Sequence, residues 1–414
     1  MKKLVALLLA LTLCIGLCAC GATAEKPAEE TPATTGETET PATAAKDIKV
    51  GFIFLHDENS TYDLNFINAA KAAAAELGLS DDQVMMKTNI AESQACYDAA
   101  AELVDAGCDL VITDSFGHES FALAAAKEFP EVQFVSCTGV KAHTEGLSNF
   151  HNAFASIYEG RYLAGVAAGL KLNEMIENGD ITAEEAKMGY VGAYPYAEVK
   201  SGYTSFFLGA RSICPSVTME VTFTSSWYDE ALEKEAANKL INNGCVLISQ
   251  HADSMGAPTA CETAGVPNVS YNGSTVAACP NTFIVSSRID WTPFFVYAIN
   301  CVASGEDIGY DWTGTLATGS VVLTDVNEQA AAAGTVEKIA EVMKALEDGS
   351  VKVFDTATFT VNGETVTTYL ADVDDLGDYV GETEAISDGV FLESFYRSAP
   401  YFDLDIDGIT NLDA

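Results

Sequence analysis

Two side chains suited to holding a flat polar ligand, Trp227 and Asp253, each follow a predicted strand. A β-branched run ends at Ser226, just before Trp227, and a buried run at 245–249 precedes Asp253. A polar amphipathic helix at about 229–243 separates the runs, a spacing typical of successive parallel strands. Because open parallel sheets bind ligands at the carboxyl ends of their strands, both residues are predicted to lie at a binding edge.

Other predicted strands also end in loops rich in polar and aromatic residues. The polar loop at 56–63 follows the run at 48–55, and the loop at 114–117 follows the run at 108–113. Tyr194 and Tyr196 follow a further run at 188–192. If these strands share a binding edge, aromatic walls and a few carboxylate or amide groups would surround one small ligand.

The elements that would position these residues alternate between strand and helix along most of the chain. Two successive α/β halves of similar layout predict an α/β fold with two doubly wound, Rossmann-like lobes joined by a multi-strand hinge. The expected first lobe covers 47–153 plus 288–317, and the second covers 154–287 plus 318–414. The strand at 283–289 and the helix at 291–304 are expected to return to the first lobe. Asn362-Gly363 predicts a hairpin near the end.

Catalytic signatures are missing from the sequence. The five His residues are expected on separate loops, and no nucleophile elbow, phosphate-binding loop or zinc-protease motif is present. The cysteines have no metal-ligand spacing, and most of those after Cys20 are expected to be buried free thiols. The sequence therefore favours a binding protein with no cofactor and no metal over an enzyme.

The first residues predict export. A short basic start and an apolar run at 4–17 are typical of a signal peptide at 1–19, and the residues around Cys20 resemble a bacterial lipobox. Lipidation of Cys20 and a solvated tether at 20–46 would hold the folded part at the outer face of the cell membrane. The formal charge of −39 would repel nucleic acid and anionic lipid, so we expect no nucleic-acid partner.

Several segments together resemble one protein family. They are EGRYLAGVAA at 159–168, GYVG at 189–192, the glycines of the next helix, SWYD at 226–229, EKEAA at 233–237 and QHADS at 250–254. The chain is similar to substrate-binding lipoproteins of ABC importers in the basic membrane protein (BMP) family, which have the type I periplasmic-binding-protein fold. The resemblance implies a purine nucleoside or purine base as ligand, an ABC permease as partner and a monomeric protein.

The resemblance also implies ligand-binding residues. Trp227 and Asp253 match family positions, Tyr194 is a weaker candidate from its strand end, and Asn59-Ser60 stands where some relatives have Gly-Trp. The full set of candidates is Asn59, Ser60, Tyr62, Asn65, Asp114, Ser115, Phe116, Tyr194, Trp227, Asp253, Asn272 and Arg288.

Each main candidate also has a purely structural interpretation. Asp253 could cap the helix predicted at 254–264, and Asp114 could cap the helix after it. The interpretations for the others are lobe packing for Trp227, loop anchoring for Tyr62 and Phe116, and a hinge salt bridge for Arg288. At the level of function, the alternatives are a membrane-anchored ligand sensor and a nucleoside-processing surface enzyme.

Overall fold

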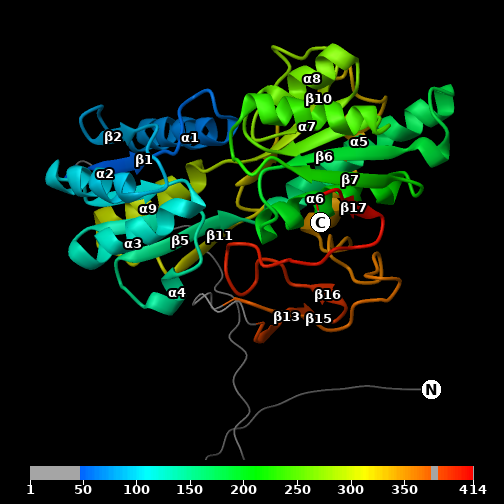
Figure 1. Ribbon diagram of the computed structural model, residues 1–414. Helices are drawn as coiled ribbons and strands as arrows, with labels where there is room; N and C mark the ends of the chain where they lie inside the picture. Colours follow the sequence, from blue (N-terminus) through cyan, green and yellow to red (C-terminus); the bar gives the residue numbers. More distant parts are fainter. Residues whose placement is uncertain (1–46, 374–380, 414) are drawn as a thin grey trace, which may run out of the picture. The chain divides into compact units, whose positions relative to one another are not determined.

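The computed structural model describes residues 47–373 and 381–413, which belong to one compact unit. Within it, two mostly parallel sheets form two α/β lobes, as predicted (Figure 1). The first sheet has the order β11-β5-β4-β3-β1-β2 and is parallel throughout. Its strands are β1 (Val50–Ile53), β2 (Val84–Lys87), β3 (Leu110–Thr113), β4 (Gln133–Ser136), β5 (Phe150–Ala155) and β11 (Asp311–Gly314).

The second sheet has the order β12-β10-β9-β8-β6-β7-β17, and only β12 runs antiparallel to its neighbour. Its strands are β6 (Lys187–Gly192), β7 (Thr218–Phe223), β8 (Leu247–His251), β9 (Asn268–Tyr271), β10 (Phe283–Ile289), β12 (Val321–Leu323) and β17 (Ile409–Asn411). The expected return of the strand at 283–289 to the first lobe is wrong, because β10 pairs with β9 and β12 in the second sheet. The helix that follows it does return, since it packs against α1.

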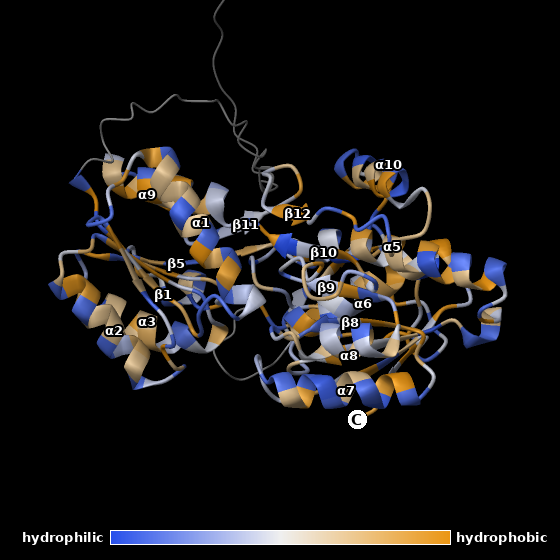
Figure 2. Ribbon diagram, turned by 90° about the horizontal axis from the view of Figure 1, so that it is seen from above, coloured by the Kyte–Doolittle hydropathy of each residue, from blue (hydrophilic) through white to orange (hydrophobic). Residues whose placement is uncertain are grey.

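Helices cover both faces of each sheet (Figure 2). In the first lobe, α1 and α9 lie on one face and α2 and α3 on the other; in the second, α5 and α6 oppose α7 and α8. The bounds are α1 (Thr61–Leu77), α2 (Gln94–Asp105), α3 (Glu119–Glu128), α4 (Ala142–Glu145), α5 (Ile157–Asn178), α6 (Ala197–Ile213), α7 (Glu230–Asn242), α8 (Gly256–Ala264), α9 (Thr292–Ser304) and α10 (Thr335–Glu347). Buried apolar clusters fill each layer, because strands covered on both faces must be apolar on both.

The helices α5 and α6 approach so closely that glycine is required at their contact. A Cβ at Gly165 would lie 2.0 Å from the carbonyl oxygen of Phe206, and one at Gly209 would lie 2.1 Å from that of Tyr162. Gly165 and Gly209 therefore allow the two helix backbones to pack in direct contact. This contact holds α6 in place, and the loop before α6 carries Tyr194 and Tyr196, two of the second-lobe aromatic residues described below.

The short remaining elements lie mostly in the C-terminal part of the chain. They are the 3-10 helices Phe116–His118 and Ala183–Glu185 and the strands β13 (Leu370–Ala371), β14 (Thr383–Glu384), β15 (Ile386–Ser387) and β16 (Val390–Phe391). At the predicted hairpin, Val361 bridges Glu364, and Asn362 and Gly363 both have positive φ, of 54° and 80°. The eight cysteines in the described part of the chain are free and buried, as expected.

Candidate ligand-binding site

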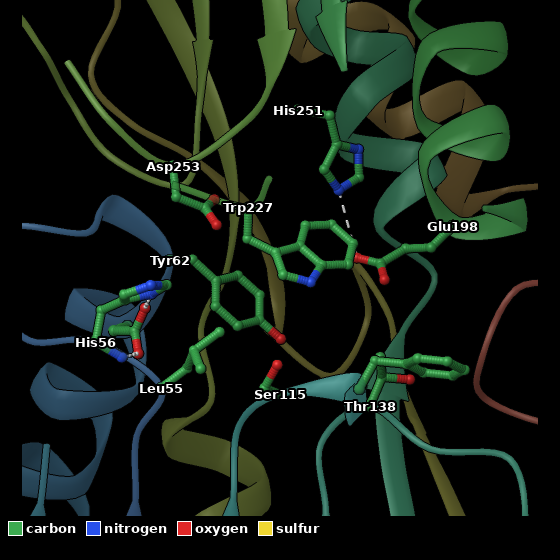
Figure 3. Close-up of a pocket in the computed structure, with 11 residues that line it drawn as sticks. Leu55, His56, Tyr62, Ser115, Thr138, Glu198, Trp227, His251 and Asp253 are labelled. Atoms are coloured by element: carbon green, nitrogen blue, oxygen red, sulfur yellow. Dashed lines mark hydrogen bonds and ion pairs between the residues drawn. The ribbon is translucent and has the colours of Figure 1, made fainter. Parts of the chain in front are cut away.

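A narrow slot opens where the strand ends of the two lobes meet (Figure 3). The empty space within it, including its open mouth, is about 390 Å³. Most of this space is too narrow for a water molecule, whose centre fits in only about 20 Å³. A ring system can therefore enter only if the lining side chains or the lobes move apart. The lining residues are Leu55, His56, Tyr62, Asp63, Ser115, Phe116, Thr138, Glu198, Trp227, His251 and Asp253.

Three aromatic side chains form a group on the second-lobe side of this slot. The ring of Trp227 lies 5.1 Å from that of Tyr194, at 65°, and 6.1 Å from that of Tyr196. Strand β7 ends at Phe223, and Ser225 then adopts a positive φ of 58°, which reverses the chain before Trp227. Trp227 is thus held by neighbouring rings while it lines the slot, so it packs within its lobe and is also available to a ligand.

Asp253 lies beside Trp227, and its backbone N–H donates to the Trp227 carbonyl at 3.0 Å. Its carboxylate accepts a hydrogen bond from Asn272 Nδ2 at 3.3 Å, and no other partner is found within the described ranges. Burial, followed by the charges of Asp63, Glu233 and Glu198, raises the pKa of Asp253 well above its usual value. The acid is therefore easily protonated, and a neutral carboxylic acid can both donate and accept.

The interpretation of Asp253 as a helix cap is wrong. Helix α8 begins at Gly256 with Met255 in the cap position, and the Gly256 N–H is satisfied by Ser254 Oγ at 3.0 Å. The residue after Asp253 therefore supplies the hydrogen bond that a capping carboxylate would have made.

Tyr62 reaches the slot from the first turn of α1. Its hydroxyl donates to the Asp114 carbonyl at 2.8 Å, and its ring packs 5.0 Å from that of Phe66. These two contacts fix the ring orientation, so Tyr62 is both an anchor for its loop and part of the slot wall. In Figure 3 it lies beneath the indole of Trp227, with its hydroxyl towards Ser115.

The buried carboxylates of the first lobe are held by the protein itself. Asp63 accepts from the His56 backbone N–H at 2.7 Å and from Ser60 Oγ at 2.6 Å. Although burial alone would raise the pKa of Asp63, hydrogen bonds from His56, Asp114 and Ser60 lower it. Asp114 accepts from the Leu55 N–H at 3.0 Å, and burial together with the nearby charge of Asp63 raises its pKa well above the usual value.

Asp114 does not act as a helix cap either. The short 3-10 helix that follows has Ser115 in the cap position without a side-chain capping bond. The carboxylate instead ties the end of β3 to Leu55, just beyond β1, and its carbonyl holds Tyr62. Ser115 and Phe116 do line the slot, and Ser115 Oγ also donates to Glu92 at 2.5 Å.

The remaining predicted residues lie outside the slot. Ser60 is the N-cap of α1 and is only 1% exposed, and Asn59 bonds to Asp57 at 2.8 Å. Tyr194 contacts the Trp227 ring edge-on and does not line the slot. Asn65, Asn272 and Arg288 line a separate hollow with about 770 Å³ of empty space.

Thr61 lines that hollow and also joins the two lobes directly, because its backbone N–H donates to the Asp253 carbonyl at 3.0 Å. Asn65 Nδ2 donates to Asn272 Oδ1 at 3.4 Å, which adds a second link between the lobes. Arg288 lies 3.5 Å from Asp290, where the chain leaves β10, as its salt-bridge interpretation predicts.

Sequence reasoning missed Glu198 and His251 as slot residues. His251 Nε2 lies 3.4 Å from Glu198 Oε1, and burial lowers the pKa of His251 below its usual value. His251 ends β8, so its position at a strand end was an available signal. Glu198 lies in the first turn of α6, where an acidic residue near a helix N-terminus gives no hint of a site.

Two negative findings apply to the described residues alone. They contain no group of three or more His, Cys, Asp or Glu side chains placed to hold a metal ion. None of their helices is long and apolar enough to cross a membrane. Cys20, the signal peptide and the tether lie outside the described residues.

Comparison with known protein families gives one match over residues 54–353, to the model described as Bmp, ABC transporter substrate-binding protein PnrA-like. This match covers well over half of the chain. The chain belongs to this family. A purine-binding protein of Brucella abortus is 31% identical over 267 residues, which are 64% of this chain and 71% of the relative. A putative ABC transporter glucose-binding protein of Haloferax volcanii is 31% identical over 217 residues, which are 52% of each chain.

Solved structures support the fold. A solute-binding protein of an ABC transporter system from Aeropyrum pernix superposes with a TM-score of 0.60 at 18% identity, covering 74% of this chain and 92% of that one. A similar protein from Conexibacter woesei gives 0.59 at 20% identity, covering 74% and 98%. These likenesses and the two-lobed arrangement establish the type I periplasmic-binding-protein fold, as the sequence predicted.

Proposed function

We propose that this ABC transporter substrate-binding protein captures a purine nucleoside or a purine base in the slot. The observation that carries the proposal is the combination of Trp227, Tyr62 and Asp253 around one narrow space. A purine has two π faces and an edge of donors and acceptors, so it suits two aromatic side chains and one buried acid.

Asp253 supplies the recognition of the purine edge. Because its raised pKa favours the protonated form, one oxygen can donate to a ring nitrogen while the other accepts from an exocyclic amine or ring N–H. Trp227 stacks on the base, and Tyr62 forms the facing wall with its hydroxyl already bonded to Asp114. Ser115 and Phe116 complete the first-lobe side of the slot.

Capture requires the lobes to separate and then close. The slot is too narrow to admit a ring system as its side chains lie, and direct hydrogen bonds join the lobes at Thr61 and Asp253. We propose that the open form takes up the ligand, and that closure presents it to an ABC permease. Lipidation of Cys20 would hold the protein at the outer face of the membrane, near that permease.

Two relatives suggest different ligands, and a thermal-shift panel separates them. One is named for purine binding and the other for glucose binding. The panel contains adenosine, inosine, guanosine, adenine, hypoxanthine and D-glucose at millimolar concentration. At a concentration 100 times its Kd, a ligand stabilises the folded protein by about 2.7 kcal/mol, so a tight ligand raises Tm clearly. At least one purine is expected to raise Tm; a shift with glucose alone would overturn the proposal.

A further inference from the structure

The C-terminal segment, defined here as residues 354–373 and 381–413, begins where the family match ends at 353. It is firmly attached to the second lobe. Its last strand β17 adds to the sheet beside β7, and Ser201 Oγ donates to Glu393 at 2.5 Å. Lys200 on α6 forms ion pairs with Asp403 at 2.8 Å and with Asp405 at 3.1 Å.

The same segment also contacts the first lobe (Figure 1). The Ser398 N–H donates to Asp311 Oδ2 on β11 at 2.8 Å. His143 Nε2, on α4, donates to the Val373 carbonyl at 2.9 Å. The C-terminal segment therefore spans both lobes beside the slot.

Between the lobes and the C-terminal segment lies a chamber with about 580 Å³ open to water-sized molecules. It shares Phe116, Thr138 and Glu198 with the slot, so the two spaces adjoin at these residues. More than half of the described lining residues come from the C-terminal segment: Tyr369, Leu370, Asp372, Gly381, Arg397, Ala399, Pro400, Tyr401 and Asp403.

The junction offers hydrogen bonds to a ligand. Thr138 is 2% exposed, and its hydroxyl has no hydrogen-bond partner among the described residues although it lines both spaces. Glu198 also lines both spaces, with its carboxylate 3.4 Å from His251 Nε2 (Figure 3). An unpartnered buried hydroxyl is unfavourable in the empty protein, so a polar ligand group at this point would gain its hydrogen bond.

The charge of the chamber wall is predominantly negative. Its lining residues include three carboxylates, those of Glu198, Asp372 and Asp403, and one guanidinium, that of Arg397; Lys200, which pairs with Asp403, does not itself line the chamber. An anionic group in the chamber would meet like charges at close range, whereas hydroxyl groups could donate to the carboxylates.

Resting on the proposed function, we infer that the C-terminal segment completes the ligand site. The chamber receives the part of the ligand that projects from the slot, accepts a neutral group bearing hydroxyls, and disfavours phosphate. This segment would then be a specificity element outside the part of the chain that matches the family.

The test compares nucleosides with their 5′-monophosphates by isothermal titration calorimetry, using the mature protein, Asp403→Asn and Asp405→Asn. Asp405 is the matched control, because it pairs with the same Lys200 but does not line the chamber. In the unaltered protein the monophosphate should bind at least about tenfold more weakly than the nucleoside. Asp403→Asn should reduce the ratio of the monophosphate Kd to the nucleoside Kd about three- to tenfold, and Asp405→Asn should leave that ratio unchanged.

The inference is overturned if monophosphates bind as tightly as nucleosides, or if Asp403→Asn and Asp405→Asn behave alike. Should Asp403→Asn fail to fold, Asp372→Asn carries the same expectation. Binding of a free base without binding of any nucleoside would also overturn the inference that the chamber receives part of the ligand, while leaving the proposed function intact. If no purine binds any of the proteins, the proposed function fails and the chamber inference fails with it.

Discussion

In the first lobe, the Asp63 carboxylate accepts hydrogen bonds from the His56 backbone and from Ser60. In the second lobe, the Asp253 carboxylate has one partner in the described part of the chain, Asn272. Both acids are buried and both line the slot. The first is held in place by its own lobe, whereas the second keeps hydrogen-bonding capacity that a ligand can use.

The aromatic residues show the same contrast. Tyr62 in the first lobe donates its hydroxyl hydrogen bond to the Asp114 carbonyl, while Trp227 in the second contacts the rings of Tyr194 and Tyr196 and is partly exposed. We infer that the first lobe provides a preorganised wall and the second provides recognition. The predictions below test this division, starting with the largest expected effect.

The first prediction concerns pH, because the pKa values of two buried acids, Glu233 in the second lobe and Asp63 in the first, are shifted in opposite directions. Burial raises the pKa of Glu233, which accepts from the Ser254 N–H beside Asp253, from 4.5 to about 7. Folded protein therefore holds a proton that unfolded protein has lost between these pH values, so stability falls as pH rises from about 4.5 to 7. At about 1.4 kcal/mol per pKa unit, this loss is on the order of 3 kcal/mol.

Urea unfolding at pH 5 and pH 8 should show that Glu233→Gln reduces the pH dependence of stability by about this amount, while Glu235→Gln, exposed on the same helix, leaves it unchanged. Other buried acids, such as Glu393 with its pKa raised to about 7, keep their own contributions in both variants. The opposite sign is expected for Asp63 in the first lobe. Because its pKa is lowered, its contribution is present above its ordinary value of 3.8 and is lost as pH falls further. Equal pH profiles for the two glutamine variants would contradict the account.

The second prediction is that Trp227→Ala weakens purine binding about ten- to hundredfold. Stacking of a base on an aromatic side chain contributes about 1–3 kcal/mol. Calorimetry measures the change, and Tyr310→Ala is the control, because Tyr310 is an exposed aromatic residue that lines no described pocket. Equal losses in both variants would show that Trp227 does not contact the ligand.

The third prediction separates stability from binding at the two carboxylates. Asp63→Asn should reduce the free energy of unfolding by about 1–3 kcal/mol, because it disturbs a buried acceptor of two hydrogen bonds. Asp253→Ala should change the unfolding free energy less but weaken purine binding about tenfold, because it removes both the donor and the acceptor that a neutral carboxylic acid offers to the purine edge. Denaturation gives the unfolding free energy of each variant, and calorimetry gives its purine affinity. A larger loss of affinity at Asp63 and a larger loss of stability at Asp253 would show that the lobes have the opposite roles.

The smallest expected effect is that of Ser60→Ala. Ser60 caps α1 by accepting from the Asp63 N–H at 3.2 Å, and loss of such a cap costs about 1 kcal/mol. Ligand affinity should stay within about twofold of the unaltered protein once the concentration of folded protein is matched. A loss of affinity greater than the loss of stability explains would make Ser60 a ligand contact after all.

The sequence was sufficient to predict the lobes, because buried parallel strands and amphipathic helices have distinct patterns. The helix predicted at about 229–243 is α7, which covers Glu230–Asn242. The sheet to which β10 belongs was not predicted, because an apolar run carries no information about its neighbours. Trp227 and Asp253, which the sequence places just after two strands, both line the slot.

The other site predictions were limited by hydrogen bonding that sequence does not reveal. Ser60 and Asn59 have suitable chemistry, but the fold turns them towards neighbouring acids. Asn65 and Arg288 face a separate hollow, because the contact at Thr61 divides the space between the lobes. Glu198 was missed because its role depends on how α6 is placed against β8, which is a tertiary property.

Difference hydrogen–deuterium exchange, with and without a saturating purine nucleoside, tests the division between the lobes most directly. The account predicts that the ligand adds the strongest protection from exchange at 225–228 and 251–254, which carry Trp227 and Asp253. Less added protection is expected at 57–60, a loop already held by hydrogen bonds within the protein. Protection confined to 57–60, or none at either second-lobe segment while the ligand is bound, would contradict it.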